Sequence, residues 1–175
     1  GGLIRHLTVD RCAAGPDNTF GAGEFRLPEP PDTVPADPST FEPLDVPTRV
    51  LDTRPKSAVG PRSLRGPLSP GDVIDLDLDG VVADDATAVA INVTVTESDR
   101  PSYLQVLPTL EAGVGAFSNV NIDGPGQTRS NFAIVPLSTD DSITIYLTGG
   151  GHLLVDLMGT FRRADGAVRA GRFVP

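Results

Sequence analysis

The residue types of this 175-residue chain that most often act in catalysis are its two histidines and its single cysteine. His152 and Asp156 lie four residues apart in a β-like run, so we expect both side chains on one face of a strand. Nucleophilic catalysis also needs a serine or cysteine beside the base and a group that orients the base. No such partner accompanies this pair in the sequence. We therefore predict a chain without catalytic residues, and keep a hydrolase centred on His152 and Asp156 as an alternative.

Three aspartates at alternate positions are candidate metal ligands. Asp75, Asp77 and Asp79 precede Gly80, as in the first half of a calcium-binding EF-hand loop, where carboxylates at alternate positions coordinate the ion. The twelfth position of that loop should be a glutamate, but here it is Ala86. The residues between the aspartates are apolar, which is typical of a strand with an acidic, solvent-exposed face. We predict a strand and no cofactor, with calcium at the three aspartates as the alternative.

Polar residues inside the apolar runs form a third candidate group: Asp52, Arg54, Asn92, Asn119, Asn121, Asn131 and Asp156. A buried polar group without a hydrogen-bond partner is costly, so such residues usually satisfy one another. Asp52 and Arg54 are two residues apart and should project to the same side, where one of them would bridge to Asp156. We predict a structural polar network, and a ligand recessed among these groups is the alternative.

Eight short β-like runs must position these residues, at 48–53, 72–79, 86–98, 102–109, 116–123, 130–138, 142–148 and 152–161. In residues 89–96, apolar and polar side chains alternate, which is typical of half-buried antiparallel strands. Short turns such as 98–101, 123–126 and 149–151 predict hairpins. We predict an all-β fold, an antiparallel β-sandwich of about eight strands with jelly-roll or Ig-like connections.

Composition limits the partners of the chain. A net charge of −9 and a pI near 4.5 argue against nucleic-acid binding, which requires a basic surface. No run approaches the ~20 apolar residues that cross a membrane. Sugar-binding surfaces generally use exposed aromatic side chains, and this chain has no tryptophan and only two tyrosines, Tyr103 and Tyr146. A carbohydrate- or cell-envelope-binding module is therefore an alternative function and not the first choice.

Proline and glycine divide the chain into four parts. Residues 28–47 contain seven prolines and should form an extended linker, because proline disfavours helix at the preceding residue. Residues 1–27, with a short helix or turn, precede this linker. The sandwich follows at 48–163, and residues 164–175 form a tail. The chain begins with Gly1 and no methionine, so we expect a piece of a longer polypeptide. The closing Phe-Val-Pro at 173–175 echoes Phe-Glu-Pro at 41–43, as the start of a further repeat would.

The segment Arg49-Val50-Leu51-Asp52-Thr53-Arg54 resembles the "R-[LV]-L-D-T-R" repeat domain of secreted actinobacterial proteins. Further segments match that domain in order, at 66–68, 88–96, 103–104, 118–121 and 151–156. The resemblance covers most of residues 41–163. It implies an extracellular or cell-surface accessory domain at the C-terminal end of an exported enzyme, with characteristic residues that are structural.

Residues 1–27 resemble a different family. The segment 3–7 and the turn Gly15-Pro16-Asp17-Asn18-Thr19-Phe20-Gly21-Ala22-Gly23 are similar to the end of a subtilisin-like serine protease domain. The Gly-Thr-Ser motif around the nucleophile of that family is absent from this chain. The resemblance implies that the partner is the preceding catalytic domain of the same polypeptide, and that this chain is its non-catalytic end. That role would be spacing, stabilisation or weak tethering to an envelope polymer or glycan.

Overall fold

The computed structural model describes residues 8–9, 24–25, 39–60 and 64–163. Two compact units, Gly1–Ala36 and Asp37–Pro175, are described separately. In the first unit, β1 (Thr8–Val9) pairs with β2 (Glu24–Phe25) in antiparallel orientation. The helix or turn predicted near residues 3–7 and the tail at 164–175 lie outside the described residues. Within the described ranges, no helix has the length and hydropathy needed to cross a membrane.

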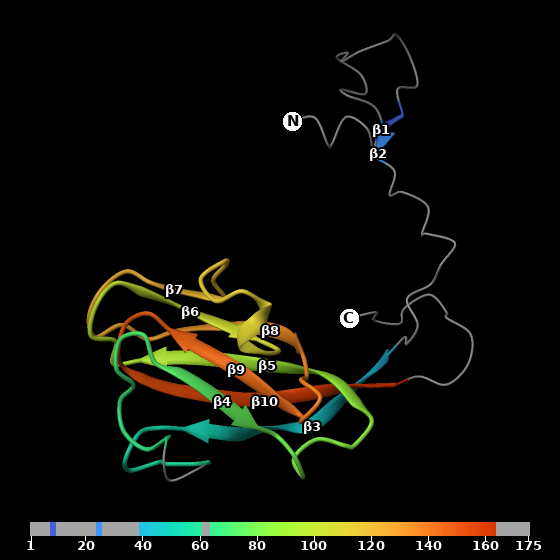
Figure 1. The fold of residues 1–175 in the computed structure, drawn as a ribbon, viewed down its shortest axis with the longest axis horizontal. Helices are drawn as coiled ribbons and strands as arrows, with labels where there is room; N and C mark the ends of the chain where they lie inside the picture. Colours follow the sequence, from blue (N-terminus) through green and yellow to red (C-terminus); the bar gives the residue numbers. More distant parts are fainter. Residues whose placement is uncertain (1–7, 10–23, 26–38, 61–63, 164–175) are drawn as a thin grey trace. The chain divides into compact units, whose positions relative to one another are not determined.

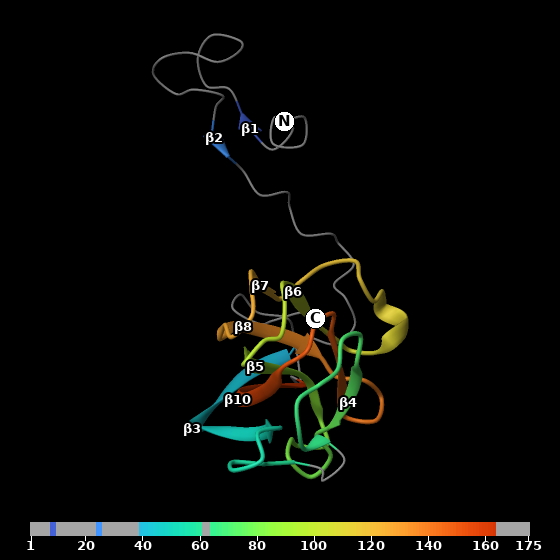
Figure 2. The same cartoon turned by 90° about the vertical axis from the view of Figure 1, so that its left-hand side faces the viewer.

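The second unit is built from eight strands in two four-stranded antiparallel sheets, an arrangement consistent with a β-sandwich. Figures 1 and 2 show these sheets as two layers. The first sheet has the order β3-β10-β5-β8, with bounds Ser39–Asp52, His152–Arg163, Ala86–Thr96 and Arg129–Pro136. The second has the order β4-β9-β6-β7, with bounds Val73–Asp77, Ser142–Leu147, Ser102–Leu107 and Val120–Ile122. The predicted all-β fold with eight strands is confirmed.

The core lies between the two sheets and follows the predicted alternation. One cluster of buried residues contains Val89, Ile91, Val93 and Val95 of β5 together with apolar residues of β10 in the same sheet and of β9 in the opposite sheet. Each fully buried side chain of this kind contributes about 1.5–3 kcal/mol relative to its exposed state. The polar residues between them lie on the outer face of their sheet. The period of two in the sequence therefore decides which face is buried.

The expected linker is wrong for residues 39–47, which belong to β3 and not to an extended connection. β3 is the edge strand of its sheet and pairs only with β10. Pro43 lies opposite Gly159 in this pairing. An edge strand tolerates proline because its outer backbone groups have no neighbouring strand to bond. The prolines of this segment therefore mark a sheet edge. Residues 28–38 lie outside the described residues.

The predicted hairpins are also wrong at three turns. The connections after β5, β7 and β9 each lead to a strand of the opposite sheet. These connections have four to six residues. Stacked sheets lie about 10 Å apart, and even four extended residues span up to about 14 Å. Turns of this length can thus pass from one sheet to the other, and the sequence alone does not separate that geometry from a hairpin. In the second unit as described, β6 and β7 are the one consecutive pair that is bonded within a sheet.

Candidate functional site

The C-terminal end of β3 carries a cluster of ion pairs around Asp52. Asp52 is only 2% exposed, and its two carboxylate oxygens accept four hydrogen bonds. Arg54 donates three of them: its backbone N and Nε to Oδ1, each at 3.0 Å, and Nη2 to Oδ2 at 2.7 Å. Arg49 donates the fourth, from Nη1 to Oδ2 at 3.1 Å. The buried carboxylate is therefore fully paired.

Arg49 extends this cluster to the neighbouring strand β10. Its Nε and Nη2 atoms donate to Oδ1 and Oδ2 of Asp156 at 2.5 and 3.0 Å, a bidentate pairing. Asp156 and Arg49 are cross-strand partners in the sheet. We expected Asp52 or Arg54 to bridge to Asp156, but the bridging residue is Arg49. The positive charges of the two arginines, Arg49 and Arg54, thus balance the negative charges of the two aspartates.

Beside these ion pairs, Thr53 binds His152. The Thr53 hydroxyl lies 3.0 Å from Nδ1 of His152 and accepts a hydrogen bond from the Leu153 backbone N–H, also at 3.0 Å. Thr53 is fully buried, and His152 is 8% exposed. Since the hydroxyl already accepts from Leu153, its own proton can be donated to Nδ1. His152 and Asp156 therefore have different partners, Thr53 and Arg49.

The pairing lowers the pKa of Asp52 to about 2, chiefly through the hydrogen bonds donated by Arg54. A carboxyl whose pKa is lower in the folded than in the unfolded state stabilises the fold above the unfolded pKa, near 3.8. That contribution should disappear as the pH falls from about 4 to about 2. Because the side chains of both arginines are about one-third exposed, we expect it to be about 1 kcal/mol.

Urea denaturation at pH 6 and at pH 2.5 measures this contribution. We expect Asp52→Asn to lower the free energy of unfolding at pH 6 and to have a smaller effect at pH 2.5. Asp84→Asn, at an exposed position, serves as the control and should change neither value by more than about 0.5 kcal/mol. Equal losses for Asp52→Asn at both pH values would contradict the assignment.

A cavity of about 400 Å³ adjoins these groups. His152 and Arg54 form one part of its wall, and Glu97, with the left-handed φ of 53°, forms another. The rest of the lining is Pro55, Lys56 and Ser57. The lining of the cavity contains both positive and negative side chains. It could not be predicted from the sequence, because its walls come from three separate segments.

Of the four asparagines of the predicted network, Asn92 lies beside this cluster, and Asn119, Asn121 and Asn131 lie apart from it. Asn119 accepts a hydrogen bond from the Val106 backbone N–H at 2.7 Å, and its own carbonyl accepts one from Nδ2 of Asn131 at 2.8 Å. Asn92 is the cross-strand partner of Asp156 in β5. Asn121 is exposed on β7. The predicted polar residues therefore form separate groups, and Asn131 and Asn121 are on the surface.

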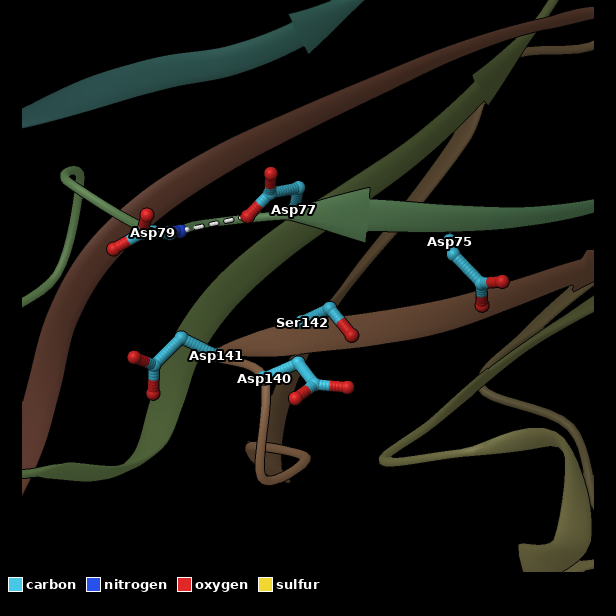
Figure 3. Close-up of a pocket in the computed structure, with 6 residues that line it drawn as sticks. All are labelled: Asp75, Asp77, Asp79, Asp140, Asp141 and Ser142. Carbon is cyan, nitrogen blue, oxygen red and sulfur yellow. Dashed lines mark hydrogen bonds between the residues drawn. The ribbon is translucent and has the colours of Figure 1, made fainter.

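The three aspartates of the candidate calcium loop lie on and just beyond β4, and the predicted acidic strand is confirmed. Asp75 and Asp77 are exposed between buried residues, and Thr144 Oγ1 donates to Asp75 at 2.7 Å. The three border an open cavity of about 580 Å³, whose other walls are Asp140, Asp141 and Ser142. Figure 3 shows that these carboxylates point in different directions, and the Asp79 backbone N–H donates to Asp77. Among the described residues, no group of three or more histidine, cysteine, aspartate or glutamate side chains is placed to hold a metal ion.

The outer face of the second sheet brings the two tyrosines together. Tyr103 on β6 and Tyr146 on β9 meet edge to face, with ring centroids 6.1 Å apart. A cavity of about 220 Å³ beside Tyr103 is also lined by Gly115, Phe117, Ser118 and Asn121. The sequence did not indicate this group, because its members lie on three strands and one loop.

We compared the chain with protein-family models, with curated proteins and with solved structures, and none of the three comparisons finds a match.

Proposed function

We propose that this chain is a non-catalytic, extracellular accessory domain at the C-terminal end of a secreted subtilisin-like peptidase. Its role would be spacing, stabilisation or weak tethering of the catalytic domain that precedes it. One observation carries the proposal: the side chains that suggested chemistry are bonded to other side chains of the same domain. Asp156 is paired with Arg49, Asp52 with both arginines, and His152 with Thr53. Groups held in this way fix β3 to β10 and favour a structural role.

The order of the strands supports the jelly-roll over the Ig-like form of the sandwich. Consecutive strands alternate between the two sheets from β3 to β10, apart from the β6–β7 pair. Jelly rolls consist of eight strands in two sheets. Such a unit is stiff, because both sheets share one core, and stiffness suits a domain that spaces or tethers another. The fold alone does not identify a ligand, because binding depends on the particular residues of a surface site.

A carbohydrate- or cell-envelope-binding module is the second candidate function. The small number of aromatic residues argued against it. In its favour, Tyr103 and Tyr146 lie on one face, and Phe117, which is 48% exposed, lines the cavity beside Tyr103. Exposed aromatic side chains that gather at a cavity often mark a binding site.

Two measurements test the first proposal. The purified 175-residue chain should hydrolyse neither casein nor p-nitrophenyl esters, and His152→Ala should be indistinguishable from the wild type in both assays. The natural polypeptide should carry, immediately before Gly1, a domain with the aspartate, histidine and serine of a subtilisin-like enzyme. Hydrolysis that disappears in His152→Ala would favour the hydrolase alternative, and a different preceding domain would overturn the link to a peptidase.

A further inference from the structure

We propose that the cavity beside Tyr103, on the outer face of the second sheet, binds a neutral hexopyranose unit of a polysaccharide. The inference rests on the tethering role proposed above and assigns it a site and a class of ligand. The cavity lies where β6, β7 and the loop between them meet, and Figure 1 shows these elements side by side.

The first argument is the placement of aromatic surface. Tyr103 and Phe117 both line the cavity, although they come from a strand and from a loop. Phe117 is 48% exposed, so much of its ring is in contact with water. Tyr146 packs its ring against Tyr103 at an interplanar angle of 73°, which restricts how the Tyr103 ring can turn. The axial C–H groups of a pyranose ring form a flat apolar face that stacks on such rings.

The second argument is that the loop carrying Phe117 is held in place from beneath. Gln105 of β6 is fully buried, and its amide bonds the loop twice. Its Nε2 donates to the Gly113 carbonyl at 3.1 Å, and its Oε1 accepts from the Gly115 N–H at 2.7 Å. At the far end of the loop, Asn119 bonds the backbone of β6. A binding surface that is already ordered avoids the entropy cost of ordering it on binding.

The third argument is a set of unused polar groups around the aromatic rings. Among the described residues, the Tyr103 hydroxyl, the Ser118 hydroxyl and the Asn121 amide have no hydrogen-bond partner. Asn121 and Tyr103 are cross-strand partners, so both side chains stand on the same side of the sheet. Two hydroxyls and an amide can each donate and accept, as the hydroxyls of a sugar do.

The cavity lining contains no charged side chain, which favours a neutral sugar over an anionic one. Its five residues are a tyrosine, a glycine, a phenylalanine, a serine and an asparagine, none of them ionised at neutral pH. An anionic sugar would find no cation there. Proline-rich peptides also bind aromatic grooves. The backbone of a polyproline segment can only accept hydrogen bonds, whereas the hydroxyls of a neutral hexopyranose both donate and accept, as the three polar groups around the rings do.

Titration of the ¹⁵N-labelled chain, followed by amide chemical shifts, tests the proposal. The probes are the β-1,4-linked hexamers of glucose and of N-acetylglucosamine, with hexagalacturonate and a decaproline peptide as comparisons. We expect at least one neutral hexamer to shift the amides of Tyr103 and residues 115–121 at millimolar concentration. Phe117→Ala should weaken that binding roughly tenfold, as loss of an aromatic anchor does. Tyr103→Phe, which removes only the hydroxyl, should weaken it about three- to tenfold.

Phe132→Ala is the matched control, because Phe132 is 53% exposed and lies on β8 in the other sheet. It should bind like the wild type. Lack of binding to both neutral hexamers would overturn the proposal, as would preference for hexagalacturonate or decaproline, or equal losses in Phe117→Ala and Phe132→Ala. These results would leave the accessory-domain proposal intact, because that proposal depends on the hydrolysis assays and on the preceding domain.

Discussion

Thr53→Val is expected to lower the free energy of unfolding by about 2–4 kcal/mol. Valine has nearly the same shape as threonine but lacks the hydroxyl. The change leaves the Leu153 N–H without its acceptor and Nδ1 of His152 without its partner, both in a buried position. Each buried polar group that loses its partner costs about 1–3 kcal/mol. Urea denaturation measures the loss, and an unchanged m-value would show that the compactness of both states is preserved.

Two variants distinguish the loss of stability caused by the missing Thr53 hydroxyl from losses with other causes. Thr53→Ser keeps the hydroxyl and should lose only about 1 kcal/mol, through the missing methyl group. Thr128→Val removes an exposed hydroxyl that bonds Thr96, and it should change stability by less than about 0.5 kcal/mol. If Thr53→Val were as stable as Thr53→Ser, the link between Thr53 and His152 would not hold β3 to β10.

Gly151→Ala is expected to destabilise the fold by about 2–4 kcal/mol. Gly151 has a φ of 135°, a conformation that residues with a Cβ rarely adopt. An added Cβ would lie 3.0 Å from the Thr96 carbonyl oxygen and 3.1 Å from the Ser98 Cα. These are backbone atoms and cannot rotate away. Gly151 is also bonded in both directions to Leu68, so it cannot move outward without breaking that bridge.

Gly124→Ala is the matched control for this substitution. Its φ is not in the positive range, and an added Cβ would meet no atom within 4 Å. The control should be neutral or slightly stabilising, because alanine lowers the entropy of the unfolded chain. A Gly151→Ala variant with the stability of the control would mean that the turn between β9 and β10 adjusts freely. The measurement is again the midpoint and slope of urea unfolding.

The network at the end of β3 was only partly predictable from the sequence. Asp52 and Arg54 were expected on one side of the strand because they are two residues apart, and they do belong to the network, although neither bridges to Asp156. The role of Arg49 was not foreseen, since its partner Asp156 lies 107 positions away along the chain. That pairing depends on β3 and β10 being neighbours, and no local pattern specifies which strands pair. The bond from Thr53 to His152 was unforeseen for the same reason.

Local alternation determined the strands, because a period of two assigns each side chain to a face wherever one face is buried. That rule identified the eight strands and the apolar residues of the core without reference to any distant contact. The sequence also showed the acidic strand around Asp75 and Asp77. Local patterns did not predict the strand that contains Pro43, because prolines are typical of linkers as well as of edge strands. Whether a strand lies at an edge depends on the arrangement of the whole sheet.

The tertiary structure alone decided which turns cross between the sheets and which surface residues meet. Turns of four to six residues have similar sequences whether they close a hairpin or pass between the two sheets, so the packing of the whole core determines which of the two forms. The meeting of Tyr103 with Tyr146 and the placing of Phe117 beside Tyr103 follow from that choice. Sites assembled from several strands and a loop depend on long-range contacts, and these form only when the apolar faces of both sheets are buried together.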